Sequence, residues 1–191
     1  MIERHSLLSL EAYARERSSF RAKVIEHKKH RTVALGEHVT LLFEDELTVR
    51  YQVQEMLRIE RIFEEDGIRH ELDAYNPLVP DGANWKATML IEYPDAEERR
   101  RMLARLKGIE GRVWVQVGGG ERVYAIADED LERENEEKTS AVHFLRFEIG
   151  AAVARLRQDV TLAIGVDHPE YRAVLDPVPG DIRAALAQDL A

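Results

Sequence analysis

The sequence predicts a single α+β domain over residues 1–191, in which helices pack on a mixed, largely antiparallel sheet. Segments with helical spacing of apolar residues and short runs rich in β-branched residues both occur along the chain. Glycine-containing turns separate several of the β-rich runs, which favours antiparallel pairing. No internal repeat, low-complexity linker or domain boundary is visible, and 191 residues suffice for one sizeable core.

Residues 1–31 predict an N-terminal helix. Ser9 is placed to cap it, Glu11 falls in its first turn, and the basic run EHKKHR falls in its last turn, as the helix dipole favours. Apolar residues recur at helical spacing at Leu10, Tyr13, Phe20 and Val24. They form one stripe, so a homo-oligomer joined through this helix is one hypothesis, although Arg17 interrupts the stripe.

The remaining elements follow from periodicity and breakers. The other predicted helices cover Glu46–Asp66 with Gly67 as a stop, residues 96–106 with a capping box from Asp95 and Glu98, a stretch near Ala151–Arg157, and the C-terminus from Asp181. The predicted strands lie in Arg31–Phe43 around Gly36, Lys86–Tyr93, the runs RVWVQV and RVYAIA around GGGE, Thr139–Ile149, and Val160–Val166. Glu71–Trp85 is expected to be a loop, and the acidic run Asp128–Glu137 a solvated segment.

Composition and charge exclude several classes of function. The chain has no cysteine, which rules out a disulfide framework, a thiolate metal site and a cysteine nucleophile. Its net charge of −9 disfavours binding to nucleic acid or to an anionic membrane. No signal peptide or membrane-spanning run is visible, so we expect a cytoplasmic protein that has neither nucleic acid nor membrane as a partner.

Two polar residues fall on the apolar side of the helix predicted from Glu46. A helical wheel builds the apolar stripe from Val49, Val53, Met56, Ile59 and Phe63, and it places Arg50, Gln54, Arg58 and Arg61 opposite. Gln52 and Glu60 fall within the stripe. A carboxylate held away from water needs a partner, so Glu60 forms an internal ion pair, for example with Arg17 or Arg146, or belongs to a ligand pocket.

His143 raises the same question on a predicted interior strand. A single histidine there is usually a hydrogen-bonded core residue. If His143 faces the same cavity as Glu60 and Glu64, the three side chains predict a metal site or an acid–base pair. The spacing fixes no metal, and the cofactor stays unknown.

The segment after this helix supplies further candidate ligand-binding residues on irregular backbone. They are Tyr75, Asn76, Asp81, Asn84 and Trp85. Loops on a rigid scaffold often carry binding groups. The alternative is a proline-stiffened connection in which the Asn and Asp side chains cap local turns.

Two other signals have structural explanations. The GGGE segment joins two strands rather than a strand and a helix, so we interpret it as a hairpin turn and not as a phosphate loop. His27 and His30 have the spacing of metal ligands, but the neighbouring Lys and Arg residues would repel a cation.

Five long motifs resemble one bacterial family. They are VALGEHVTLLFED, YQVQEMLRIERIF, ELDAYNPLVPDG, KATMLIEYPD and KTSAVHFLRFE, and together they extend over nearly the whole chain. They are similar to the "domain of unknown function 3501" family, to which no activity is assigned. Genes of that family often lie near those for rubrerythrin-like and Fe–S oxidoreductase proteins. The resemblance therefore implies a redox or stress-response setting and a redox-protein partner, and it carries over no catalytic residue.

Three hypotheses about function follow. The first is a non-catalytic accessory protein that binds a small ligand or a partner near Glu60 and the Tyr75–Trp85 segment, and it is favoured because no reaction machinery is recognisable. The second is an enzyme or metal-binding protein that uses Glu60. The third is a structural homo-oligomer.

Overall fold

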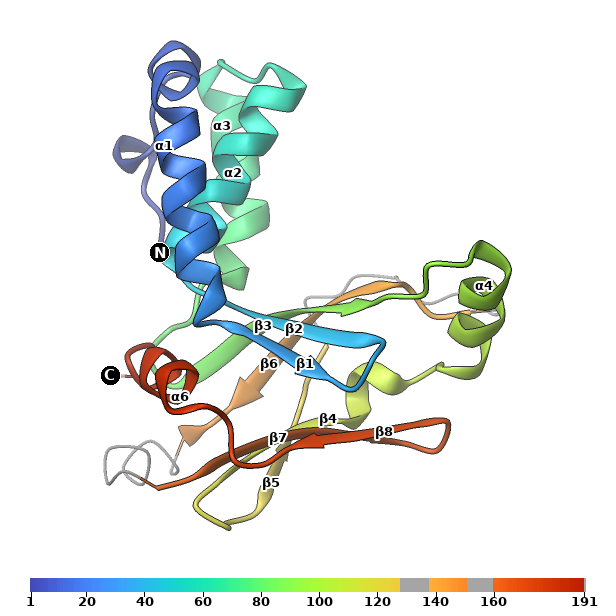
Figure 1. Cartoon of the computed structure of the whole chain (residues 1–191). Coiled ribbons are helices and arrows are strands. Elements are labelled where there is room, and N and C mark those ends of the chain that lie inside the picture. Colours follow the sequence, from blue (N-terminus) through green and yellow to red (C-terminus); the bar gives the residue numbers. More distant parts are fainter. Residues whose placement is uncertain (128–137, 151–159, 191) are drawn as a thin grey trace.

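The computed structural model describes residues 1–127, 138–150 and 160–190, and it consists of two four-stranded antiparallel sheets with helices packed against them. The predicted α+β class is confirmed (Figure 1). The strands form two sheets instead of one, and every ladder between the described strands is antiparallel. No helix among the described residues combines the length and apolarity that crossing a bilayer requires.

The first sheet has the order β1-β2-β3-β6, and the second has the order β5-β4-β7-β8. The strands of the first sheet are β1 (Thr32–Leu35), β2 (Val39–Glu44), β3 (Asn84–Ile91) and β6 (Val142–Glu148). Those of the second are β4 (Val113–Val117), β5 (Arg122–Tyr124), β7 (Leu162–His168) and β8 (Tyr171–Leu175). The helices are α1 (Leu10–Lys29), α2 (Glu46–Glu60), α3 (Glu65–Tyr75), α4 (Ala96–Arg105) and α6 (Gly180–Ala187), with short 3-10 helices at Arg4–Ser6, Asn76–Leu78 and Ile109–Arg112.

The inner faces of the two sheets enclose the main hydrophobic core. Alternate residues of the strands point into it, among them Phe43, Met89, Val115, Leu145 and Ile164. Trp85 is fully buried there, and its indole nitrogen donates to the Leu186 carbonyl, which fixes α6 against the sheets. The core therefore consists of side chains from both sheets and from the C-terminal helix.

Both margins of the two sheets are joined. On one side, Ile126 and Arg146 exchange two backbone hydrogen bonds of 2.8 Å, which link the segment after β5 to β6. On the other side, the Tyr171 hydroxyl donates to the Leu35 carbonyl at 2.6 Å and accepts from the His38 amide at 3.1 Å. Gly36 has a φ of 71°, and a Cβ there would lie 2.6 Å from the Tyr171 hydroxyl, so this turn requires glycine.

The first three helices form a second hydrophobic cluster that stands beside the sheets (Figure 1). In α1, Tyr13 and Val24 are buried within the chain, and Phe20 makes edge contacts with the Tyr13 and Tyr51 rings. Within residues 1–31, for which a helix was predicted, α1 covers Leu10–Lys29, and the Ser9 side chain accepts from the Ala12 amide as its cap. Part of its apolar stripe packs against the chain's own α2, where the Phe20 ring contacts the Tyr51 ring.

The predicted helix Glu46–Asp66 is two helices. The first ends at Glu60, because Arg61 adopts a left-handed conformation with a φ of 55°, and α3 begins at Glu65. Gly67, predicted as a stop, lies inside the first turn of α3, where Glu65 and Asp66 suit the helix dipole. The predicted Glu71–Trp85 loop is also wrong at both ends, since α3 extends to Tyr75 and β3 begins at Asn84.

Most strand predictions are confirmed, including the hairpins around Gly36 and GGGE and the strands that became β3, β6 and β7. The Asp95 cap is present and accepts from the Glu98 amide at 2.7 Å. Strand β8 was not predicted, because the prolines around Tyr171–Leu175 indicated an interruption of regular secondary structure. The predicted acidic segment Asp128–Glu137 and the helix near Ala151–Arg157 lie outside the described residues.

A buried arginine connects the N-terminal helices to the sheets and to α6. Arg31 follows α1 and is 2% exposed. Its guanidinium donates to the carbonyls of Phe43 and Glu44 and forms ion pairs with Asp45 and Asp189. Asp45 is also the N-cap of α2 and accepts from His27 at 2.5 Å. One cation thus joins α1, β2, α2 and the C-terminal segment.

Replacing this cation tests its role. We expect Arg31→Met to lower the free energy of unfolding by about 3–5 kcal/mol, because the change leaves buried carboxylates and carbonyls without their donor. Urea denaturation measures the difference. Arg21→Met, at an exposed position of α1, is the matched control and is expected to change stability by less than about 0.5 kcal/mol. Equal effects of the two substitutions would contradict this role of Arg31.

Candidate functional site

Glu60 is exposed at the last turn of α2, so the prediction that it is held away from water is wrong. Ile59 and Phe63, which were assigned to the same stripe, are 58% and 71% exposed. The residues of α2 that are buried are Thr48, Val49, Val53, Gln54 and Leu57. The buried face of α2 is thus rotated, relative to the predicted stripe, toward Leu57 and α1. The helix also ends at Glu60, before Phe63, which was predicted to belong to the stripe.

Gln54 was predicted to lie on the solvent-exposed side of the helix, opposite the apolar stripe. Its side chain is 1% exposed and binds the N-terminal segment. Its side-chain oxygen accepts from the Leu8 amide at 2.6 Å, and its nitrogen donates to the Leu8 carbonyl at 3.4 Å. Both hydrogen bonds stay within the chain. This amide is therefore part of the packing between α2 and the segment before α1.

The buried acid near α2 is Glu44, at the end of β2. It is 1% exposed and accepts hydrogen bonds from Thr48 at 2.5 Å, from Thr88 at 2.6 Å and from Gln52 at 3.2 Å. Gln52 thus has the structural role of satisfying this carboxylate. The buried acid that needs partners is therefore Glu44, and not Glu60 as predicted from the sequence.

The interruption of the α1 stripe by Arg17 also has a structural explanation. Arg17 pairs with Glu55 through contacts of 2.7 and 3.0 Å, and the Tyr13 hydroxyl donates to Glu55 at 2.7 Å. The hydrogen bonds from Arg17 lower the pKa of Glu55 to about 2, and those from Tyr13 and Arg58 act in the same direction. The pairing predicted between Arg17 and Glu60 is thus made with Glu55. Arg146, the other predicted partner, contacts Glu148.

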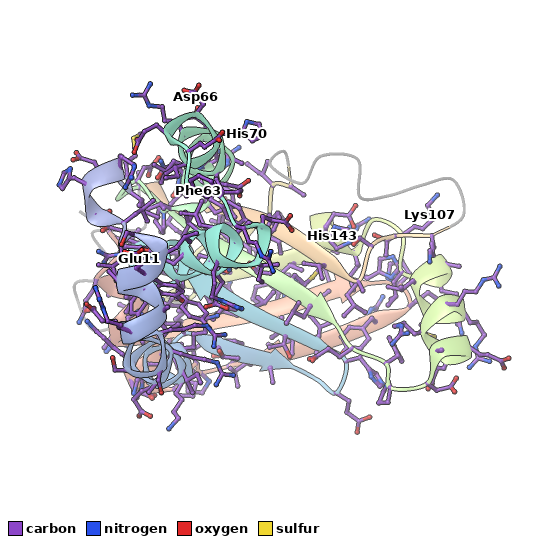
Figure 2. The ribbon with its side chains drawn as sticks, turned by 90° about the horizontal axis from the view of Figure 1, so that it is seen from above. Glu11, Phe63, Asp66, His70, Lys107 and His143 are labelled. Atoms are coloured by element: carbon purple, nitrogen blue, oxygen red, sulfur yellow. The ribbon has the colours of Figure 1, made fainter. Side chains whose placement is uncertain are left out.

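The predicted metal site of Glu60, Glu64 and His143 is not assembled. Glu64 is exposed before α3, whereas His143 is 1% exposed on β6 and lies 2.9 Å from the Thr139 hydroxyl. Figure 2 shows His143 far from Phe63, which is the neighbour of Glu64 in the chain. Across the described ranges, no group of three His, Asp or Glu side chains is placed to hold a metal ion.

The candidates in the Tyr75–Trp85 segment mainly shape the chain. Asn76 exchanges hydrogen bonds with the Ile2 backbone at 2.8 and 3.1 Å. Asp81 accepts from the Ala83 amide, and Asn84 accepts from the Asp81 amide, so both cap a local turn. Trp85 belongs to the core, and half-buried Tyr75 packs against the cluster formed by the first three helices.

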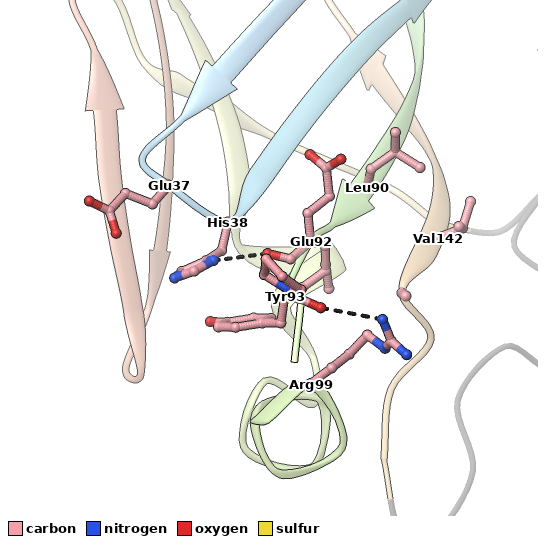
Figure 3. Close-up of a pocket in the computed structure, with 10 residues that line it drawn as sticks. Glu37, His38, Leu90, Glu92, Tyr93, Arg99 and Val142 are labelled. Carbon is pink, nitrogen blue, oxygen red and sulfur yellow. Dashed lines mark hydrogen bonds between the residues drawn. The ribbon is translucent and has the colours of Figure 1, made fainter. Parts of the chain in front are cut away.

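A groove of about 750 Å³ lies where the β1–β2 turn, the end of β3, the start of β6 and α4 meet (Figure 3). Leu90 and Val142, opposite each other on β3 and β6, form an apolar floor that is partly exposed. The other lining residues are Glu37, His38, Ile91, Glu92, Tyr93, Pro94, Arg99 and Ala141. Apolar surface and a few charged groups therefore meet in one concave region.

Arg99 supplies the cation of this groove. It is exposed on α4, and its side chain reaches toward the strand that bears Val142 (Figure 3). Its guanidinium donates to the Tyr93 carbonyl at 3.3 Å and forms no ion pair with any carboxylate of the described residues. The groove also contains two acids, Glu37 and Glu92, and Glu92 accepts from the Thr40 hydroxyl at 2.9 Å. Arg99 thus retains donors for an anionic group.

His38 and Tyr93 form one wall of the groove. Their rings stack with centroids 3.9 Å apart and an interplanar angle of 16°. His38 Nδ1 donates to the Glu92 carbonyl at 2.9 Å, which leaves Nε2 of the neutral ring as an acceptor. Burial raises the pKa of the Tyr93 hydroxyl. Both rings are thus held rigidly at the rim.

None of the groove residues was predicted as a site residue from the sequence. The segment IEYPD followed by EERRR contains an aromatic residue, a strand end and several cations, which is a weak indication of a site. The side chains come from segments separated by up to about a hundred residues in the chain, and they share no motif.

Comparisons with known proteins agree on a relationship and offer no activity. The family model described as "Protein of unknown function (DUF3501)" matches residues 1–190. A crystal structure of a protein of unknown function from Burkholderia pseudomallei K96243 is 59% identical, and the match covers 100% of this chain and 99% of that chain, with a TM-score of 0.91. No curated protein matches significantly. These relatives confirm the resemblance seen in the motifs and add nothing about a redox or stress role.

The exchange of roles between Glu44 and Glu60 can be measured. We expect Glu44→Gln to destabilise the fold by about 1–3 kcal/mol, because the amide nitrogen would face a hydroxyl or amide donor in a buried site. Glu60→Gln is the matched control, with an expected change below about 0.5 kcal/mol. Urea denaturation of both variants decides the matter, and a larger loss in Glu60→Gln would restore the original prediction.

Glu55 predicts a specific dependence of stability on pH. The pKa of Glu55 is lowered to about 2 in the folded state, whereas a glutamate in the unfolded chain has a pKa of about 4.3. The contribution of Glu55 to the free energy of unfolding is therefore fully present above the unfolded pKa and is lost as the pH falls toward about 2. We expect this contribution to be about 1–2 kcal/mol after allowance for solvent screening.

The test compares unfolding free energies at pH 5 and pH 2.5 in the wild type and in Glu55→Gln. The wild type is expected to lose more stability than the variant between these two values. Equal losses would show that the Arg17–Glu55 pair contributes nothing to acid sensitivity.

Proposed function

The chain belongs to the DUF3501 family of proteins of unknown function, and we propose that it is a non-catalytic binding protein for a small apolar ligand that bears one carboxylate. The site is the groove lined by Leu90, Val142, Glu92, Tyr93 and Arg99. The observation that supports this proposal is a guanidinium without an ion pair among the described residues, beside a partly exposed apolar floor.

The charged part of the groove, at Arg99, and its apolar floor determine which kind of ligand fits. A carboxylate fits the forked donors of Arg99, and an alkyl or aryl part covers Leu90 and Val142. Glu37 and Glu92, the two acids of the lining, add negative charge to the groove, which disfavours a second anionic group on the ligand. A monocarboxylate is therefore preferred to a dicarboxylate of equal length.

The structure affects the other two hypotheses about function differently. An enzyme or metal-binding protein that uses Glu60 loses its physical basis, because Glu60 lies in solvent. A homo-oligomer stays a prediction, although α1 does not offer the expected surface. The cytoplasmic location, the redox or stress-response setting and the redox-protein partner also stay predictions, and the described residues add no support for them.

The binding proposal is tested with octanoate as the probe. We expect octanoate to shift the NMR methyl signals of Leu90 and Val142 in a saturable manner. Arg99→Gln is expected to weaken this binding about 5–10-fold, because a charge-assisted hydrogen bond is lost at a partly exposed site. The neighbouring exposed Arg100, which does not line the groove, provides Arg100→Gln as the matched control.

Two further probes separate the contributions. 1-Octanol lacks the charge and suberate carries two carboxylates, and both are expected to bind more weakly than octanoate. The proposal is wrong if octanoate leaves the Leu90 and Val142 signals unchanged, or if Arg99→Gln and Arg100→Gln bind it equally well.

A further inference from the structure

The outer face of the second sheet carries a cluster of arginines around a tryptophan. The ladder register places Asp167 opposite Arg172, and it places Arg112 on the other side of Asp167, one residue before the pair Val113–Val166. The adjacent row runs from Tyr124 through Trp114 to Gly165 and Val174. Two cations thus flank an acid beside an aromatic row, on a chain whose net charge is −9.

Trp114 is fixed flat against the sheet. A Cβ on Gly165 would lie 2.4 Å from Cζ2 of the indole, so the glycine provides the space that the ring occupies. The Arg122 guanidinium lies over the indole, 4.0 Å from the ring centroid. The side chain is 2% exposed as a result. A ring held from both sides has a defined direction for its N–H.

A cavity of about 410 Å³ is bordered by these residues. Its charged members are Arg112, Arg122, Arg172 and Asp167, which gives three positive charges and one negative charge. Asp167 pairs with Arg122 at 3.5 Å and accepts from the Tyr124 hydroxyl at 2.7 Å. Within the described part of the chain, Arg112 and Arg172 form no ion pair. The cavity therefore has a surplus of about two positive charges.

Two buried polar atoms of residues that line this cavity have no hydrogen-bond partner among the described residues. They are the indole Nε1 of Trp114, which is a donor, and Oδ1 of Asp167, which is an acceptor. Leaving such groups unpaired in a buried site is unfavourable. A ligand that supplies both an anionic oxygen and a hydroxyl satisfies them together.

We propose that this cavity binds a phosphate group. A phosphate carries about 1.5–2 negative charges at neutral pH, which matches the surplus of the cavity, whereas a carboxylate carries one. Arg112 and Arg172 donate to the anionic oxygens of hydrogen phosphate, Trp114 Nε1 donates a further hydrogen bond, and the oxygen that keeps its proton donates to Asp167 Oδ1. This site is independent of the carboxylate groove.

The indole N–H signals of the two tryptophans report on the proposal directly. Titration with inorganic phosphate is expected to shift the Trp114 signal and to leave that of Trp85 unchanged, because Trp85 is buried in the core and donates to Leu186. Sodium chloride at equal ionic strength is the control. The proposal is overturned if phosphate leaves the Trp114 signal in place, or if chloride shifts it equally.

Variants locate the ion. Arg112→Gln and Arg172→Gln are each expected to weaken phosphate binding at least 5-fold, whereas Arg101→Gln, at an exposed position on α4, leaves it unchanged. Unaltered affinity in both cavity variants overturns the site. Phenyl phosphate, whose dianion has no proton to donate to Asp167, distinguishes the source of the group: tighter binding than inorganic phosphate indicates a phosphate monoester, and equal or weaker binding indicates the free ion.

Discussion

The arrangement of this molecule depends on one buried guanidinium. Arg31 lies where α1 ends and β1 begins, and burying its charge costs several kcal/mol unless every donor is satisfied. The partners come from β2, from the N-cap of α2 and from Asp189 near the C-terminus. These partners meet only in one relative placement of the helices and sheets. The demands of a single ion thereby orient elements that are remote in the sequence.

Elements set by local physics could be predicted from the sequence, and those set by packing could not. The β-branched runs, the caps at Ser9 and Asp95 and the glycine turns depend on neighbours within a few residues. The phase of α2 depends on α1, which lies against it, and this contact draws Gln54 and Leu57 inward and leaves Ile59 outside. A wheel drawn for one isolated helix does not contain that information.

The candidate site illustrates the same limit. The rule that a buried acid requires partners was correct, but the acid was Glu44, whose burial follows from the sheet and from α2 together. The residues of the groove, such as His38, Arg99 and Val142, come together only when three distant segments meet. Their residue types are ordinary for exposed positions. Recognition of such a site needs the ladder register, which short-range patterns do not fix.

The joined margins of the sheets also bear on how the protein behaves at high concentration. An open strand at the border of a sheet is a template on which another chain can add a strand and begin to aggregate. Here the Tyr171 hydroxyl forms hydrogen bonds with the Leu35 carbonyl of β1 and with the His38 amide of the following turn. At the opposite border, the backbone groups of Arg146 are paired with those of Ile126. Among the described residues, the Tyr171 hydroxyl and the Ile126–Arg146 bridge thus hinder the addition of a further strand at these two borders.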